Sequence, residues 1–378
     1  MPSERGTDEH EAGEAGTDER EAGEAEPRGR RRRREQRPPT DYYGIPPIHR
    51  AHWGGLIEWY FFLGGLASGT YVVAAIAALF GRPEHIMVVR IGRYLAPLLV
   101  VPCPVLLILD LGRPERFYNM LRVVKLRSPM SLGTWGLVGF SLLAFLSGGQ
   151  QAGRDGLLGG AGRTLARLPA RVLAGLGVPF GFFLGGYTGV LLGATAVPLW
   201  ARNARLLGPL FLSSAVSSSC ALIQLVLACL PGRHEESESA LERGELVAAL
   251  GEAAALAAIH VHSGALDAPL TTGRLGRLHA FGAIGCGIVG PLLVRSAGRW
   301  LGLPPRPRSI LASALALVGA FLVKHVMMRA GAQSADDPAA TFRFARRDGV
   351  PDAAGVSGAT SGTPAQSGYQ PPTDAARA

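Results

Sequence analysis

Several side chains that could carry chemistry lie within or at the ends of long apolar stretches. Glu58 falls just inside the first stretch, Asp110 ends the second, and Tyr187 lies within the fourth. Ionisable side chains are costly in a membrane-spanning segment, and those that occur there commonly line a ligand site or a proton path. Histidines and carboxylates with shifted pKa values can exchange protons near neutral pH. These residues are therefore the first candidates for a functional site.

If successive apolar stretches cross a bilayer in alternate directions, four polar groups fall at the face that also carries both ends of the chain. Asp110 can pair with Arg113, because Gly112 can end the helix and Pro114 prevents its continuation. The other groups are His49, His52 and Trp53 followed by Glu58, the run Arg127–Ser131, and His260 and His262 with Asp267. Convergence on one face is expected of a binding pocket at headgroup level. Ordinary helix capping and headgroup contact are the competing interpretation for each residue.

Two polar residues lie deeper. Tyr187 follows Gly185 by two positions and so faces away from a stripe of glycines. Its hydroxyl needs a hydrogen-bond partner, which could be a neighbouring helix or a ligand. Glu252 must be paired, protonated or hydrated if it lies inside the sixth stretch. The alternative for Glu252 is a helix that begins after it.

The elements that must position these residues are apolar stretches of transmembrane length. The chain has 378 residues, of which 48% are hydrophobic and 18% charged, and the charges are clustered between the stretches. A helix needs about 20 apolar residues to cross a bilayer, and only a helix satisfies its own backbone there. We therefore expect an all-α integral membrane protein with about eight transmembrane helices packed as a bundle. The stretches are approximately Leu56–Phe80, Ile91–Asp110, Pro129–Ser147, Val172–Ala201, Leu206–Leu230, Leu241–Leu266, Leu278–Val294 and Ile310–Met328.

Glycine and proline positions predict details of the bundle. Gly181, Gly185, Gly189 and Gly193 recur on one face of the fourth stretch, and such a stripe allows close helix contact in lipid. Prolines at 97, 102 and 104 should kink or break the second stretch. Ser128 suits a helix N-cap and Pro129 the first helical position. The sequence FFLGG occurs in both the first and the fourth stretches, by chance or as a trace of an inverted repeat.

Composition divides the chain into three parts. Residues 1–40 contain an acidic ten-residue repeat and then the basic run Arg28–Arg37, so we expect a disordered tail without a cleaved signal peptide. Residues 41–330 form the membrane domain, and 331–378, rich in small and polar residues, form a second disordered tail. Arginines flank both ends of the stretches, so the orientation is undecided, although the basic run slightly favours tails inside.

The chain carries a net charge of +9, but its arginines lie between apolar runs and suit lipid headgroups rather than nucleic acid. The four cysteines form no CxxC pair and lie in apolar runs, so we expect neither an iron–sulfur nor another metal site.

Four stretches resemble the polysulfide-reductase membrane-subunit family, also called NrfD or PsrC. They are WYFFLGGLASGTYVVAA (Trp59–Ala75), LLILDLGRPERFYNML (Leu106–Leu121), RSPMSLGTWGL (Arg127–Leu137) and GGYTGVLLGATAVPLW (Gly185–Trp200). The resemblance extends in order from about Tyr42 to Arg329. The chain departs from the family in its long charged N-terminal tail and in what we expect to be a short acidic loop at His234–Glu245.

The resemblance implies a multi-pass membrane anchor in a bacterial inner membrane that binds menaquinone or ubiquinone, without haem or an iron–sulfur cluster of its own. It implies a ferredoxin-like iron–sulfur partner subunit and a molybdopterin catalytic subunit. The quinone pocket would lie near the ends of the first four helices on the side of the two tails, with His52, Asp110, Arg113 and Tyr187 as quinone-binding residues. No residue of this chain is predicted to be catalytic by itself. Glu58 and Glu252 are the candidates for a proton path.

Two other functions remain open from the sequence. A cytochrome b-type anchor would need facing histidine pairs, with His260, His262, His279 and His325 as candidates. A secondary transporter would fit the inverted repeat.

Overall fold

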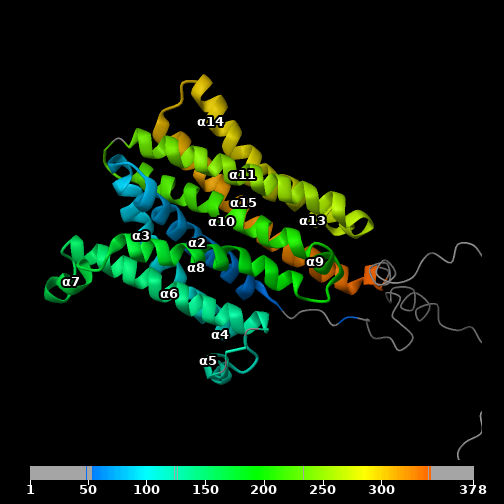
Figure 1. Ribbon diagram of the computed structural model, residues 1–378. Coiled ribbons are helices and arrows are strands. Elements are labelled where there is room, and N and C mark those ends of the chain that lie inside the picture. Colours follow the sequence, from blue (N-terminus) through cyan, green and yellow to red (C-terminus); the bar gives the residue numbers. More distant parts are fainter. Residues whose placement is uncertain are drawn as a thin grey trace, which may run out of the picture. The chain divides into compact units, whose positions relative to one another are not determined.

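The computed structural model describes residues 48, 53–122, 124–125, 127–232, 234–338 and 340–341. These residues form helices, turns and loops, without a strand in the described ranges. Eight helical spans within them are long and apolar enough to cross a membrane, which confirms the predicted fold class (Figure 1). The tail predicted for residues 1–40 lies outside the described residues, as does 342–378.

The eight spans contain the following helices. The first four are α2 (Gly55–Phe80), α3 (Ile86–Val100) with α4 (Pro102–Asp110), α6 (Pro129–Arg154) and α8 (Ala170–Gly193). The second four are α10 (Ala204–Cys229), α11 (Glu235–Ser263), the run α13 (Gly273–Arg277), η4 (Leu278–Val289) and α14 (Gly290–Trp300), and α15 (Pro305–Asp336). Short connecting helices are η1 (Pro83–His85), η2 (Pro114–Arg116), α5 (Tyr118–Arg122), α7 (Gly159–Ala166), α9 (Pro198–Arg202), η3 (Gly264–Asp267) and α12 (Ala268–Thr271).

Helices α2 and α10 lie side by side at the centre of the bundle. Each packs against the other, against α8 and against α15. Helix α2 also contacts α3 and α4, whereas α10 also contacts α11 (Figure 1). The first four spans therefore form one helical group and the last four another, joined through α2 and α10. We call the end at which α2 begins and α15 finishes the tail face.

Several predicted local features are confirmed. Ser128 caps α6, because its Oγ accepts a hydrogen bond from the Ser131 amide, and Pro129 takes the first helical position. The second span breaks between α3 and α4 at Val101, within its run of prolines. On α8, a Cβ added at Gly189 would clash with the carbonyl of Leu207, and one at Gly193 would clash with Ala204. The glycine stripe thus lets α8 approach the start of α10 at backbone contact.

Two segment boundaries differ from the sequence-based expectation. The segment His234–Glu245 is not a loop, because α11 already begins at Glu235 and holds three glutamates in its first turn, where the helix dipole favours negative charge. Glu252 therefore lies well inside a helix. Helix α15 continues past residue 328 to Asp336, so the tail predicted to begin at residue 331 begins later. Gly331 packs directly against the Trp200 indole, and the Ser334 hydroxyl accepts a hydrogen bond from the Leu199 amide.

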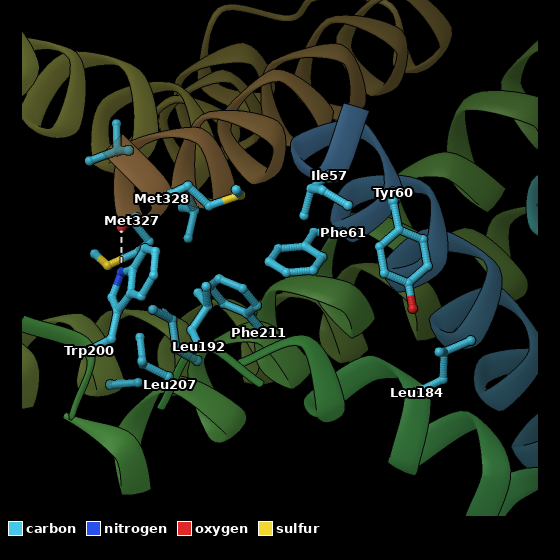
Figure 2. Close-up of a cluster of buried hydrophobic side chains, with 14 of the residues drawn as sticks. Ile57, Tyr60, Phe61, Leu184, Leu192, Trp200, Leu207, Phe211, Met327 and Met328 are labelled. Atoms are coloured by element: carbon cyan, nitrogen blue, oxygen red, sulfur yellow. Dashed lines mark hydrogen bonds between the residues drawn. The ribbon is translucent and has the colours of Figure 1, made fainter. Parts of the chain in front are cut away.

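The core at the tail face is aromatic. The Trp200 indole donates a hydrogen bond of 2.8 Å to the carbonyl of Met327, and the ring stacks on Trp53 at 5.6 Å between centroids. Figure 2 shows this bond and, beside it, Phe61 of α2 facing Phe211 of α10, whose rings meet edge to face at 6.1 Å. These contacts join the two helical groups.

The topology gives a direct expectation. In a background without native cysteines, a cysteine placed at Glu115 or at Arg274 should react with an impermeant maleimide from one side of the membrane. A cysteine at Leu157 should react only from the other side, because one crossing separates Glu115 from Leu157. Labelling of Glu115 and Arg274 from opposite sides would contradict the eight-span arrangement.

Candidate functional site

An apolar cavity of about 200 Å³ opens among α2, α4, α5, α6 and α8 near the tail face. Its walls are mostly leucine, methionine, phenylalanine, valine and proline side chains, with Tyr60, Thr134 and Tyr187 as its polar members. Concave, largely apolar sites with a few placed polar groups are typical of small-molecule binding. The cavity lies at the ends of the first four spans, which is where the resemblance placed a quinone.

Tyr187 is the predicted site residue that lines this cavity. Its hydroxyl donates a hydrogen bond of 2.5 Å to the carbonyl of Pro129, at the first turn of α6. Gly133 allows this approach, because a Cβ there would clash with the Tyr187 hydroxyl. Phe183, one turn earlier on α8, stacks on the ring at 5.2 Å and fixes its plane. The hydroxyl proton is therefore committed to Pro129, and the oxygen retains lone pairs that can accept a hydrogen bond.

Tyr60 lines the same cavity and was not singled out from the sequence. It is 2% exposed and lies on the buried face of α2, beside Phe61 (Figure 2). The sequence could have indicated Tyr60 by its position two residues after Glu58, because this spacing directs the two side chains to opposite sides of the helix.

Asp110 and Arg113 lie at the rim rather than in the wall. Asp110 is half-buried at the last residue of α4, and its carboxylate accepts a hydrogen bond from the Gly54 backbone at the start of α2. Arg113 is exposed before η2. Their chain neighbours Ile108 and Leu111 contribute to the wall. The Asp110–Arg113 ion pair considered from the sequence is not formed within the described part of the chain. His52, the fourth predicted quinone-binding residue, lies outside the described residues.

Glu58 faces away from the cavity, toward α15. One carboxylate oxygen lies 2.7 Å from His325 Nδ1, and the other lies 3.1 Å from Arg329 Nε. The Glu58 side chain is only 5% exposed, so these contacts compensate a carboxylate that lies just inside the span. The cluster couples the first helical group to the last helix of the second.

Glu252 belongs to a buried cluster in the second helical group. Lys324 of α15 donates a hydrogen bond of 2.7 Å to the Ser214 hydroxyl, which in turn hydrogen-bonds Glu252. The two opposite charges are 3% and 1% exposed, respectively, and interact through space as well. Lys324 and His325 are consecutive, so α15 contacts both candidate proton-path carboxylates. The sequence did not reveal Lys324, because a lysine near the end of an apolar stretch usually extends to the headgroups.

A third polar cluster joins α11 to η4. His260 Nδ1 lies 2.7 Å from Asp267, and His260 Nε2 lies 3.0 Å from His279 Nε2. The ring nitrogens thus face each other in a hydrogen bond rather than across the space that a haem iron would need. Of the two remaining candidates for a haem ligand, His325 is engaged with Glu58, and His262 is exposed near the end of α11. This geometry does not favour the cytochrome b interpretation.

Comparison with known proteins covers almost all of these elements. The family model described as "Polysulphide reductase, NrfD" matches residues 47–335, from before α2 to the last turn of α15. The C subunit of polysulfide reductase from Wolinella succinogenes is 29% identical over 266 residues, which cover 65% of this chain and 83% of that protein. The matched region contains the cavity and all three polar clusters.

Proposed function

This chain belongs to the polysulphide reductase NrfD family of membrane subunits, and from that premise we propose that it exchanges electrons between a membrane quinone pool and an iron–sulfur partner subunit. The observation that carries the proposal is the apolar cavity at the tail face with Tyr187 fixed in its wall. A quinone of the menaquinone or ubiquinone type suits it, because the ring and prenyl chain are apolar and reach the cavity through the lipid.

The orientation of Tyr187 favours the reduced form. Since its proton is donated to Pro129, the phenol oxygen can accept a hydrogen bond from a quinol hydroxyl, whereas a quinone carbonyl would have to displace Pro129. Oxidation of the quinol releases two electrons and two protons. Tyr187 orients the hydroxyl from which one of these protons departs.

The electrons are proposed to leave through a partner. Within the described ranges no group of three or more His, Cys, Asp or Glu side chains is arranged to hold a metal ion. A ferredoxin-like iron–sulfur subunit docked on the tail face would come nearest to the cavity, and a molybdopterin catalytic subunit would complete the complex. A bacterial inner membrane is the corresponding location.

For the protons we propose a route that includes Glu58 and Glu252. Glu58 contacts His325, and Glu252 shares Ser214 with Lys324, so two consecutive residues of α15 contact both carboxylates. A histidine next to a buried carboxylate can pass on a proton near neutral pH.

Filling the cavity tests the quinone site. Purified wild-type protein should retain quinone through extraction, whereas Thr134→Trp should retain at least ten-fold less, because the indole occupies the cavity. Leu142→Trp is the matched control, since Leu142 lies on the same helix and is 59% exposed toward lipid. Equal quinone retention in Thr134→Trp and wild type would contradict the assignment, as would a haem absorption band at stoichiometric level.

Removing the Glu58 charge tests the proton route. Glu58→Gln should slow quinol-dependent turnover several-fold and leave KM for quinol unchanged, because Glu58 faces away from the cavity. Glu236→Gln, an exposed change in the first turn of α11, is the control. A Glu58→Gln protein that turns over at the wild-type rate from pH 6 to 8 would exclude this residue from the route.

A further inference from the structure

A second hollow, separate from the quinone cavity, lies at the tail face between the start of α10 and the end of α11. Its volume is about 900 Å³, and it is lined by residues 201–206 on one side and by Ala257, Ala258, Val261, His262 and Gly264 on the other. Its ionisable members are Arg202, Arg205 and His262, and the lining contains no acidic residue. We call this hollow the α10–α11 groove.

One wall of the groove is part of a membrane-spanning helix. Ala257, Ala258 and Val261 lie within the sixth span, and Val261 is 86% exposed. Helix α11 packs mainly against α10, so this part of its surface is not covered by another described helix. Small side chains along an uncovered helix leave a shallow channel that an acyl chain can occupy.

The other wall is cationic. Arg202 donates one hydrogen bond, from Nε to the carbonyl of His262, at 3.2 Å, which leaves its terminal nitrogens available. Arg205 is exposed, and no ion pair with an acidic side chain involves it among the residues described here. Two arginines that share a groove without a counter-charge form a favourable site for an anion such as a phosphate.

Asn203 adds a further requirement. It lines the groove and is 1% exposed. Its amide nitrogen donates to the carbonyl of Leu199 at 2.9 Å and to the Ser263 hydroxyl at 2.8 Å, which fixes the side chain. Its Oδ1 has no hydrogen-bond partner. A buried acceptor of this kind is usually satisfied, so a ligand that fits the groove should bring a donor.

We propose that the α10–α11 groove binds an anionic phospholipid of the tail-face leaflet whose headgroup carries hydroxyl groups, as phosphatidylglycerol does. The phosphate contacts Arg202 and Arg205, a glycerol hydroxyl donates to Asn203, and one acyl chain lies along Ala257 and Val261. A lipid accounts for the apolar wall, which a free phosphate would leave uncovered. Basic pockets between transmembrane helices are known sites for acidic lipid headgroups.

Native mass spectrometry of the purified protein with added lipid tests the proposal. Phosphatidylglycerol should bind more tightly than phosphatidylcholine, and more tightly than phosphatidic acid, which has the phosphate but no glycerol hydroxyls. Arg205→Gln should weaken phosphatidylglycerol binding about five-fold, the effect of one arginine near an anionic lipid surface. Arg277→Gln is the matched control, since Arg277 is exposed at the same face but outside the groove.

The headgroup series and the variants each have an outcome that overturns the proposal. If phosphatidylcholine binds as tightly as phosphatidylglycerol, the groove does not recognise an anionic headgroup. If phosphatidic acid binds as tightly, the hydroxyl assigned to Asn203 is wrong. If Arg277→Gln weakens binding as much as Arg205→Gln does, the effect is one of general surface charge. Inorganic phosphate that competes with the lipid at equal concentration would show that the acyl chain makes no contribution.

Discussion

Replacing Tyr187 with phenylalanine is expected to lower kcat/KM for quinol by about ten-fold or more and to leave assembly intact. The change removes the hydroxyl that we propose accepts a hydrogen bond from the quinol, and a hydrogen bond lost in an apolar cavity costs about 1–3 kcal/mol. The ring itself should stay in place, because Phe183 stacks on it and Gly133 still provides space. Quinol-driven reduction of the partner's acceptor, measured on protein of unchanged elution volume, provides the test.

Tyr94→Phe is a matched control for this substitution. The Tyr94 hydroxyl donates to Asp155 at 2.6 Å, at the end of the bundle opposite the tail face. Burial raises the pKa of Asp155, but hydrogen bonds from Tyr94 and Gln151 and the nearby Arg90 together lower it below its usual range. Loss of this phenol should therefore change the pKa of Asp155 and leave the quinol reaction unaffected.

Asp110→Asn supplies a second test of the same cavity. Its carboxylate joins the end of α4 to the start of α2, so the substitution should loosen the rim and slow the reaction less than Tyr187→Phe does. If both variants react with quinol at the wild-type rate, the site lies elsewhere, and the His260–His279 cluster becomes the next candidate.

The sequence predicts the eight spans well, because length and apolarity alone determine which segments can cross a bilayer. Prolines also predicted the break between α3 and α4, and small residues predicted a close helix contact on one face of α8, which the structure forms with α10 at Gly189 and Gly193. Helix ends were predicted less well, since the glutamates at the start of α11 are as polar as a loop.

The cavity could be predicted only in part. Tyr187 was identified because a lone phenol in an apolar helix requires a partner, and the structure provides Pro129. The face that each helix turns to its neighbours is set by contacts between distant segments, which spacing along the chain does not reveal. Glu58 and Tyr60 illustrate this limit, because they are two residues apart and serve different helical groups.

Buried basic residues were the main omission. Arg295 contacts Glu245 at 2.6 Å, and Lys324 reaches Glu252 through Ser214. From the sequence alone, an arginine or lysine near the end of a span can be assigned to a lipid headgroup. Only the carboxylate inside a span signals that a charge must be buried and compensated. The partner lies 50 residues away for the first pair. A carboxylate well inside a span is therefore evidence for a cation on another helix, which sequence analysis can use even when it cannot identify that cation.

The Glu252–Lys324 pair should dominate the stability of the second helical group. Lys324→Met is expected to lower the free energy of unfolding by about 3–5 kcal/mol, because it leaves Glu252 buried without its counter-charge. Glu252→Gln together with Lys324→Met removes both charges and should recover much of that loss. The measurement is thermal unfolding of the purified protein in one detergent at one lipid content.

Lys125→Met is the control for this pair, since Lys125 is exposed at the tail face and makes no ion pair within the described residues. It should leave the unfolding midpoint unchanged. The decisive comparison is the double variant with the single one. A single buried charge lowers the stability of the helical group more than the pair does. The pair shares Ser214, and its two charges compensate each other's desolvation. An isolated carboxylate must instead take up a proton or water. If the double variant is no more stable than Lys324→Met, Lys324 contributes through the contact of its ammonium group with the Phe211 ring, and the explanation by the Glu252 pair is wrong.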